Sequence, residues 1–132
     1  MVAVVVFAHR RAEAATCDSS RTALFSAALR HAAPADTVDD VVRTCRDPEE
    51  IAVAAAGVTA SGHPDVAAAM ARKAIAAGPH EFVAWAALSQ ALAQDDPAGS
   101  ARAARRAKAL NPRWRPPTRT PAPTGAAGSA GP

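Results

Sequence analysis

The sequence predicts an all-α protein in which antiparallel helical hairpins stack as a short solenoid. Two stretches, residues 51–79 and 85–112, repeat one pattern: a helix rich in small residues, a turn, a second helix and a closing proline. The closing prolines are 33 residues apart, a period typical of paired-helix repeats, because one hairpin cannot bury its apolar face alone. The chain also has 38 alanines among 132 residues, three Phe, two Trp and no Tyr, which favours packed helices without strands.

Residues 1–18 are predicted to form an apolar N-terminal segment outside the repeat domain. Residues 1–8 are almost entirely apolar, and Arg10 and Arg11 follow them. A signal peptide carries its positive charges before the apolar run, and a membrane-spanning helix needs about 20 apolar residues. Two interpretations therefore stay open: the end of a membrane helix that starts upstream, or an apolar helical end that packs on the domain.

The predicted repeat domain, residues 19–115, begins with a hairpin of two helices. Ser19 or Ser20 is the expected N-cap of the first helix, and Pro34 follows its end. The second helix is expected to begin at Thr37. Its apolar residues recur at i, i+3, i+4 and i+7, so one face must meet a neighbour: Val38, Val41, Val42 and Cys45.

The two cysteines are candidates for a disulfide within this hairpin. Cys17 lies just before the first predicted helix and Cys45 at the end of the second, so an antiparallel hairpin places both at the same end. A disulfide requires α-carbons within about 7 Å, and closing a loop of this size stabilises by about 3 kcal/mol in an oxidising compartment. Neither cysteine has zinc-type or redox-type spacing.

Four further helices are marked by caps and prolines. Asp47-Pro48 predicts the start of a helix over residues 48–61, and Pro64 the start of the next, which Gly78-Pro79 closes. The strongest amphipathic stripe follows: Phe82, Trp85, Leu88, Ser89 and Leu92.

The last predicted helix begins at Asp96-Pro97 and ends near Leu110, before Asn111-Pro112. Helical geometry places Ala101, Ala104, Ala107 and Leu110 on the packing side of this helix. Residues 116–132 are rich in Pro, Gly and Ala and are expected to form a disordered basic tail.

On these residues the chain resembles a tetratricopeptide-repeat protein. Trp85, Leu88 and Leu92 match large first-helix positions of that family, Ala107 matches a small second-helix position, and Pro112 matches the terminal proline. These five are the expected structural residues. The resemblance implies paired-helix repeats that bind peptide segments or partner helices on their concave side.

The charge distribution predicts an alternative binding surface. Residues 97–132 carry seven basic and no acidic residues, whereas the rest of the chain has an acidic excess. An exposed basic face can bind a protein or peptide, an anionic membrane surface or, less favoured here, nucleic acid. Trp114 either covers the open end of the last hairpin or contacts the partner. The candidate partner-binding residues are Arg102, Arg105, Arg106, Arg113, Trp114 and Arg115.

The sequence offers no catalytic motif: it lacks G-x-S-x-G, a phosphate-binding glycine loop and HExxH, and its paired acidic residues are explained by helix starts. We therefore expect no enzyme, no cofactor and no metal. The predicted function is a non-catalytic scaffold for protein–protein interaction, in the cytoplasm or at a membrane. A basic module for anionic lipid or nucleic acid is the alternative, and a purely structural remnant of a longer repeat array is a third interpretation.

Overall fold

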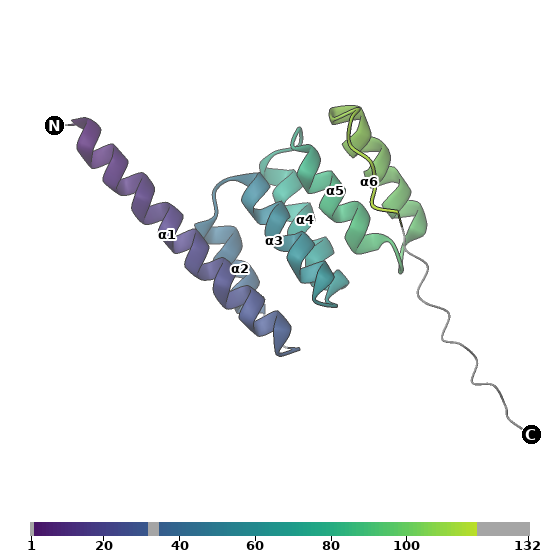
Figure 1. Ribbon diagram of the computed structural model, residues 1–132, viewed down its shortest axis with the longest axis horizontal. Coiled ribbons are helices and arrows are strands. Elements are labelled where there is room, and N and C mark those ends of the chain that lie inside the picture. Colours follow the sequence, from purple (N-terminus) through teal and green to yellow (C-terminus); the bar gives the residue numbers. More distant parts are fainter. Residues whose placement is uncertain (1, 32–34, 119–132) are drawn as a thin grey trace, which may run out of the picture.

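The computed structural model describes the backbone of residues 2–31 and 35–118, and within these ranges the side chains of all residues except 2–10 and 14. Six helices make up this part of the chain, and it contains no strand, so the predicted all-α class is confirmed. The helices follow one another across the molecule, with α1 at one edge and α6 at the other (Figure 1). They are α1 (Val2–Leu29), α2 (Ala35–Thr44), α3 (Pro48–Ala60), α4 (Pro64–Ala77), α5 (Phe82–Leu92) and α6 (Pro97–Leu110).

Consecutive helices pack in pairs, α1 with α2, α3 with α4 and α5 with α6. Both α3 and α4 also pack extensively on α5, which joins the second and third pairs into one body. The first pair touches the second more sparsely, through α1 on α3 and α2 on α4. The molecule therefore consists of a tightly packed four-helix part and a first hairpin with a smaller interface.

Alanine dominates the core. Each side chain contributes little apolar area, at about 25 cal/mol per Å², but small side chains let helix axes approach closely. Leu24, Val41, Val58 and Met70 are the largest fully buried side chains apart from the two cysteines. The alanines with no exposed area in the four-helix part are Ala52, Ala54, Ala55, Ala67, Ala71, Ala74, Ala84 and Ala107.

The predicted starts of α3, α4 and α6 are confirmed. The side chain of Asp47 accepts a hydrogen bond from the Glu49 amide at 3.0 Å, and that of Asp96 accepts one from the Gly99 amide at 2.8 Å. Each of these three helices has its proline in the first turn, where a missing N–H costs nothing. Gly62, with φ +88°, makes the turn between α3 and α4 in a conformation that favours glycine.

The predicted start of the first helix at Ser19 or Ser20 is wrong. Helix α1 begins at Val2 and continues without a break through the expected boundary between residues 18 and 19. The hydroxyl of Ser20 is not used as a cap but lies 3.0 Å from that of Thr44 on α2. The N-terminal part of α1 extends past α2 (Figure 1). Among the described residues, none of the helices combines the length and hydropathy that crossing a membrane requires.

The predicted packing side of α6 needs a correction. Ala107 is buried as expected, but Ala101 is exposed and Ala104 only half-buried, whereas Gly99 and Ala103 are buried. Residues 99, 103 and 107 are spaced by four, and such a ridge of small residues packs closely on a neighbouring helix. Ser100 strengthens the α5–α6 contact, because its hydroxyl donates to the Ser89 carbonyl at 2.7 Å.

The other expected structural residues lie as follows. Leu88 is buried, and Leu92 and Trp85 are half-buried and pack against the core. The indole Nε1 of Trp85 donates to the Pro79 carbonyl at 3.0 Å, which ties α5 to the turn that precedes it. Pro112 is exposed just after the end of α6.

Candidate functional sites

A groove lies where the C-terminal end of α5 meets the turn between α3 and α4. Its volume is about 330 Å³, at the low end of the range for ligand sites in proteins. We call it the α3–α5 groove. Three separate parts of the chain line it: Thr59 and Pro64 from α3 and α4, Gln90, Ala91, Ala93 and Gln94 from α5 and its end, and Pro117 and Thr118 from the C-terminal segment.

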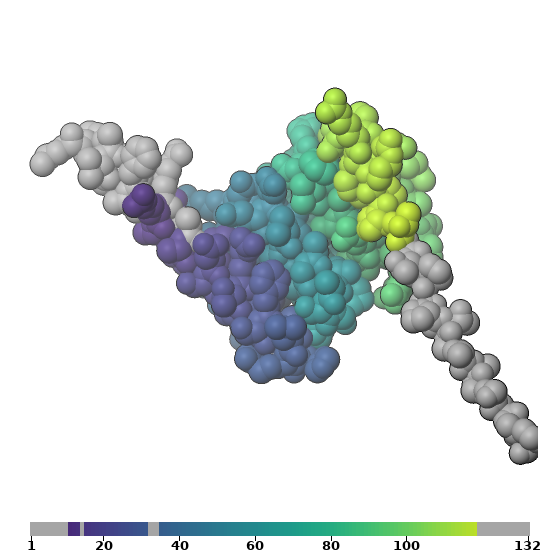
Figure 2. All heavy atoms as spheres, in the orientation of Figure 1, coloured from purple at the N-terminus to yellow at the C-terminus, as the bar shows by residue number. Residues whose placement is uncertain are grey.

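The C-terminal segment reaches the groove because the chain reverses after α6. The Asn111 amide donates to the Ala107 carbonyl at 2.9 Å, and the Trp114 amide donates back to the Asn111 carbonyl at 2.9 Å. The Asn111 side chain also accepts from the Arg113 amide at 3.2 Å. The chain then runs back along the helices (Figure 1), and its last described residues lie against the α5–α6 end of the molecule (Figure 2).

Two glutamines give the α3–α5 groove its polar character. Gln90 lies in the last turn of α5 and Gln94 in the turn that follows the helix, and both side chains line the groove. Within the described residues, neither carboxamide makes a hydrogen bond. Each carboxamide offers two donors and one acceptor oxygen, while Ala91, Ala93 and Pro64 supply small apolar surfaces beside them. The groove thus combines backbone-type hydrogen-bonding groups with shallow apolar contacts and holds no ionised side chain.

The predicted basic surface is exposed. Arg102, Arg105 and Arg106 are exposed on α6, and none has a carboxylate partner among the described residues. Arg113 and Arg115 are exposed beyond the helix end, where the Arg115 guanidinium donates to the Pro112 and Trp114 carbonyls at 2.8 and 3.0 Å. Trp114 is half-buried. The structure thus places the five predicted arginines in solvent at the C-terminal end of the fold.

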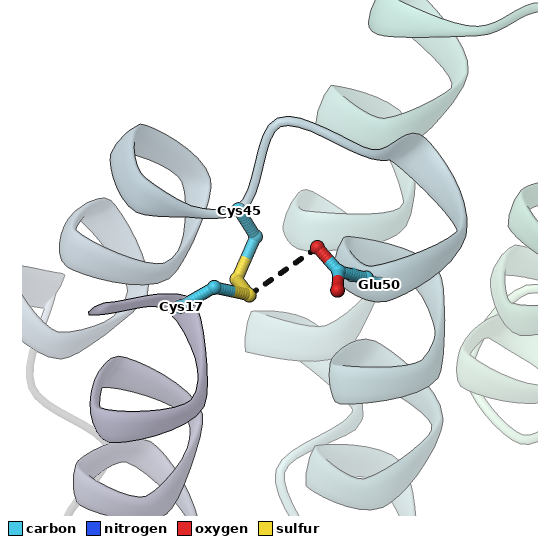
Figure 3. Close-up of side chains that lie close together, drawn as sticks. All are labelled: Cys17, Cys45 and Glu50. Carbon is cyan, nitrogen blue, oxygen red and sulfur yellow. Dashed lines mark hydrogen bonds between the residues drawn. A yellow bond between two sulfur atoms is a disulfide. The ribbon is translucent and has the colours of Figure 1, made fainter. Parts of the chain in front are cut away.

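A third feature is the cluster formed by Cys17, Cys45 and Glu50. Cys17 and Cys45 form a disulfide with an S–S distance of 2.01 Å and a Cα–Cα distance of 4.8 Å. Both cysteines are almost completely buried, at 2% and 1% exposure. Glu50, in the first turn of α3, places Oε2 3.4 Å from the Cys17 sulfur (Figure 3). The disulfide is therefore a cross-link within the first hairpin that also faces the second.

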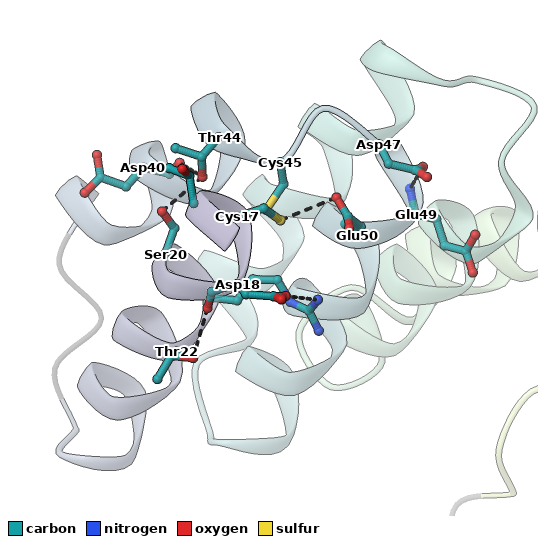
Figure 4. The surroundings of a disulfide bond; sticks show 12 residues. Cys17, Asp18, Ser20, Thr22, Asp40, Thr44, Cys45, Asp47, Glu49 and Glu50 are labelled. Atoms are coloured by element: carbon teal, nitrogen blue, oxygen red, sulfur yellow. Dashed lines mark hydrogen bonds and ion pairs between the residues drawn. A yellow bond between two sulfur atoms is a disulfide. The ribbon is translucent and has the colours of Figure 1, made fainter. Parts of the chain in front are cut away.

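The chemistry of this cluster depends on its oxidation state. A disulfide sulfur carries no proton and is not a thiolate, so the oxidised pair neither donates to Glu50 nor ligates a metal as thiolates do. In the reduced state the Cys17 thiol can donate to the Glu50 carboxylate. Polar groups surround the bridge, among them Ser20, Thr44 and Asp18 (Figure 4), but the sulfurs themselves are shielded from attack by an external thiol.

Sequence reasoning placed the two cysteines at one end of a hairpin and the arginines in solvent. It missed the α3–α5 groove, because the walls of the groove come from three regions separated by up to 59 positions, from Thr59 to Thr118. The one available signal was the i, i+4 spacing of Gln90 and Gln94 away from the buried stripe of α5. Comparisons of the chain with protein-family models, with curated proteins and with solved structures found no significant match.

Proposed function

We propose that this protein is a short tetratricopeptide-like solenoid that binds extended peptide segments of partner proteins in the α3–α5 groove and performs no catalysis. The paired packing of six helices and the sequence landmarks of residues 47–115 support the solenoid part of the proposal. The observation that carries the binding role is the groove itself, which opens between α3 and α5 and presents two carboxamides beside small apolar side chains.

An extended peptide suits this groove for a chemical reason. Its backbone carbonyl and amide groups are not paired internally, so they need partners at the binding surface. The Gln90 and Gln94 carboxamides can donate to a carbonyl and accept from an amide. The small side chains of Ala91 and Ala93 leave room for the peptide to approach α5. A partner helix would satisfy its own backbone and would need a broader apolar stripe than the groove offers.

The test is selection of peptides from a random twelve-residue library against the full chain, followed by calorimetry of the selected sequences. Each carboxamide hydrogen bond contributes about 0.5–1.5 kcal/mol, so the double variant Gln90→Ala/Gln94→Ala should weaken binding by about tenfold. The matched control is Arg105→Ala/Arg106→Ala on the exposed face of α6, which should leave the affinity unchanged. Selected peptides that bind both variants as tightly as the natural chain would contradict this site.

The exposed arginines favour a second function, the binding of an anionic surface. Arg102, Arg105 and Arg106 have no acidic partner among the described residues, so they are free to meet phosphate groups. Binding to anionic vesicles or to nucleic acid should then weaken steeply with added salt, and the Arg105→Ala/Arg106→Ala variant should bind less. Peptide binding in the uncharged α3–α5 groove should change little with salt, which separates the two functions.

A further inference from the structure

The described part of the chain ends at a wall of the α3–α5 groove. Pro117 and Thr118 form one of its walls, and fourteen residues, 119–132, follow Thr118. Any continuation of the chain therefore starts at the mouth of the groove, next to Gln90 and Gln94.

The composition of this segment matches the groove. Residues 116–132 include five prolines and otherwise only Ala, Gly, Ser and Thr, together with one arginine. Pro-rich segments favour the polyproline II conformation, which has no internal backbone hydrogen bonds and so exposes its carbonyl groups to donors such as the glutamine carboxamides. Proline rings and small side chains also fit the shallow apolar surface of Ala91, Ala93 and Pro64.

The charge and the length of the C-terminal segment also suit the α3–α5 groove. Arg119 is the only residue of the segment with a charged side chain, and the exposed Asp95 directly follows the groove residue Gln94 in the sequence. Fourteen residues in a polyproline II conformation span about 43 Å at about 3.1 Å per residue. Helix axes pack about 8–10 Å apart, so the segment is long enough to pass from α5 over α3.

We propose that the α3–α5 groove is occupied in cis by the part of the chain's own C-terminal segment that follows Thr118, residues 119–132, which a partner must displace. This proposal rests on the proposed function, because it assigns a ligand to the same groove. Tethering at Thr118 gives the segment an effective concentration on the order of 1 mM. With an intrinsic Kd of about 0.1 mM, occupied grooves would outnumber empty ones by about ten to one. The segment competes with partners for the groove, so a partner binds only if its affinity is high enough to displace the segment.

The first experiment places the segment directly. A photo-cross-linking amino acid is introduced at Ala122 in the full chain, and mass spectrometry locates the cross-linked residues. The expected products join position 122 to the tryptic peptides that contain Gln90–Gln94 or Thr59–Pro64. The Gln90→Ala/Gln94→Ala variant should lower their yield several-fold, whereas Arg105→Ala/Arg106→Ala should not. Cross-links confined to other surfaces or to other molecules would overturn the proposal.

The second experiment measures competition. In a full-length variant, residues 119–132 are replaced by fourteen residues of Gly and Ser, which keeps the chain length and the described fold. A labelled synthetic peptide of residues 116–132 should bind this variant about tenfold more tightly than it binds the natural chain, because the natural segment occupies the groove. Equal binding to the two chains, or no binding to the variant, would contradict occupation in cis.

The same two chains separate this proposal from the proposed function. Library-selected peptides that bind both chains equally would leave the peptide-binding function standing and remove the competing role of the segment. Cross-linking of position 122 to the groove, together with failure of every selected peptide to bind either chain, would keep the segment in the groove and remove the partner-binding function.

Discussion

The first hairpin and the four-helix part of this fold are held together in different ways. Helices α3 to α6 are joined by short turns and bury rows of alanine against one another. Prolines lie in the first turns of α3, α4 and α6, and acidic side chains cap α3, α5 and α6. Helices α1 and α2 carry fewer buried side chains, and a disulfide links the middle of α1 to Cys45, the residue that follows α2. The four-helix part is therefore stabilised by many small contacts, and the first hairpin by one covalent bond and a few larger side chains.

The buried residues of the two parts belong to one hydrophobic cluster, but the helices of the first hairpin meet α3 and α4 over a smaller interface than α3 to α6 share with one another. Phe25 of α1 packs over Gly57 of α3, and His63 Nε2 lies 3.3 Å from the Ala28 carbonyl. Lys73 of α4 pairs with Asp39 of α2 at 3.1 Å, beside a cavity of about 260 Å³ between these helices. Exposed ion pairs contribute about 0–1 kcal/mol. Because its interface is smaller, we expect the free energy of local unfolding to be lower for the first hairpin than for the four-helix part.

The largest expected effect comes from removing buried side chains in each part. Met70→Ala in α4 and Leu24→Ala in α1 each delete a fully buried side chain and should cost about 2–5 kcal/mol. Met70→Ala should weaken amide protection throughout α3–α6, whereas Leu24→Ala should weaken it mainly in α1 and α2. Hydrogen exchange with mass spectrometry measures both. An equal, chain-wide loss in the two variants would show that the parts unfold as one unit.

Removal of the disulfide should have the next largest effect. The double variant Cys17→Ala/Cys45→Ala releases a loop whose ends are 28 positions apart, and should destabilise the first hairpin by about 3 kcal/mol. Urea unfolding should then show an earlier transition for α1–α2 and an unchanged one for α3–α6. Reduction of the urea-unfolded chain, in which both sulfurs are accessible, followed by refolding in reductant, is the matched control: it should reproduce the effect in the natural chain and do nothing to the variant. An unchanged first transition would contradict this role.

A smaller effect is expected at the contact between the two parts. A Cβ atom on residue 57 would lie 2.5 Å from Phe25 Cε1, so Gly57→Val forces α1 away from α3 and should cost about 1–3 kcal/mol. Adding Phe25→Ala should remove most of this extra cost, because the ring is then gone. A double-mutant cycle by urea unfolding measures the coupling. Additive effects would mean that the ring moves aside without loss.

The smallest effect is expected from the caps of the four-helix part. Asp96→Ala removes the acceptor for the Gly99 amide and should cost about 1 kcal/mol. Asp96→Asn keeps an oxygen acceptor and should cost less. Thermal unfolding compares the two variants with Asp47→Ala, whose carboxylate caps α3 in the same way. Because many other contacts hold α6, neither Asp96 variant should change the unfolding of the first hairpin.

Local signals in the sequence were sufficient for the four-helix part. Asp-Pro marks the starts of α3 and α6, Pro64 marks the start of α4, and Gly or Asn follows the ends of these three helices; such residues act through their own backbone neighbours. The prediction of a helix start at Ser19 or Ser20 was wrong, because these residues resemble caps but lie within α1. The residues around them favour helix, and the Ser20 hydroxyl contacts Thr44 of α2. The buried face of α6 was also predicted incorrectly, because alanines occur on all sides of that helix and its faces therefore differ little in hydrophobicity.

The candidate sites differ in how far the sequence revealed them. The pairing of Cys17 with Cys45 was predicted correctly from an antiparallel hairpin, although Cys17 lies within α1 and not just before the first helix as expected. The position of Glu50 beside the bridge and the walls of the α3–α5 groove depend on how successive hairpins pack and on where the chain turns after Asn111. Such packing is decided by summed side-chain contacts between distant segments, so no single motif encodes it.

The position of Cys17 within α1 has a mechanical consequence. At about 1.5 Å per residue, about 22 Å of helix precede it, and this length extends past α2. A load applied to that projecting end passes to α2 through a covalent bond instead of through side-chain packing. The oxidised hairpin therefore resists separation of α1 from α2 under such a load, whereas after reduction only side-chain packing would resist it.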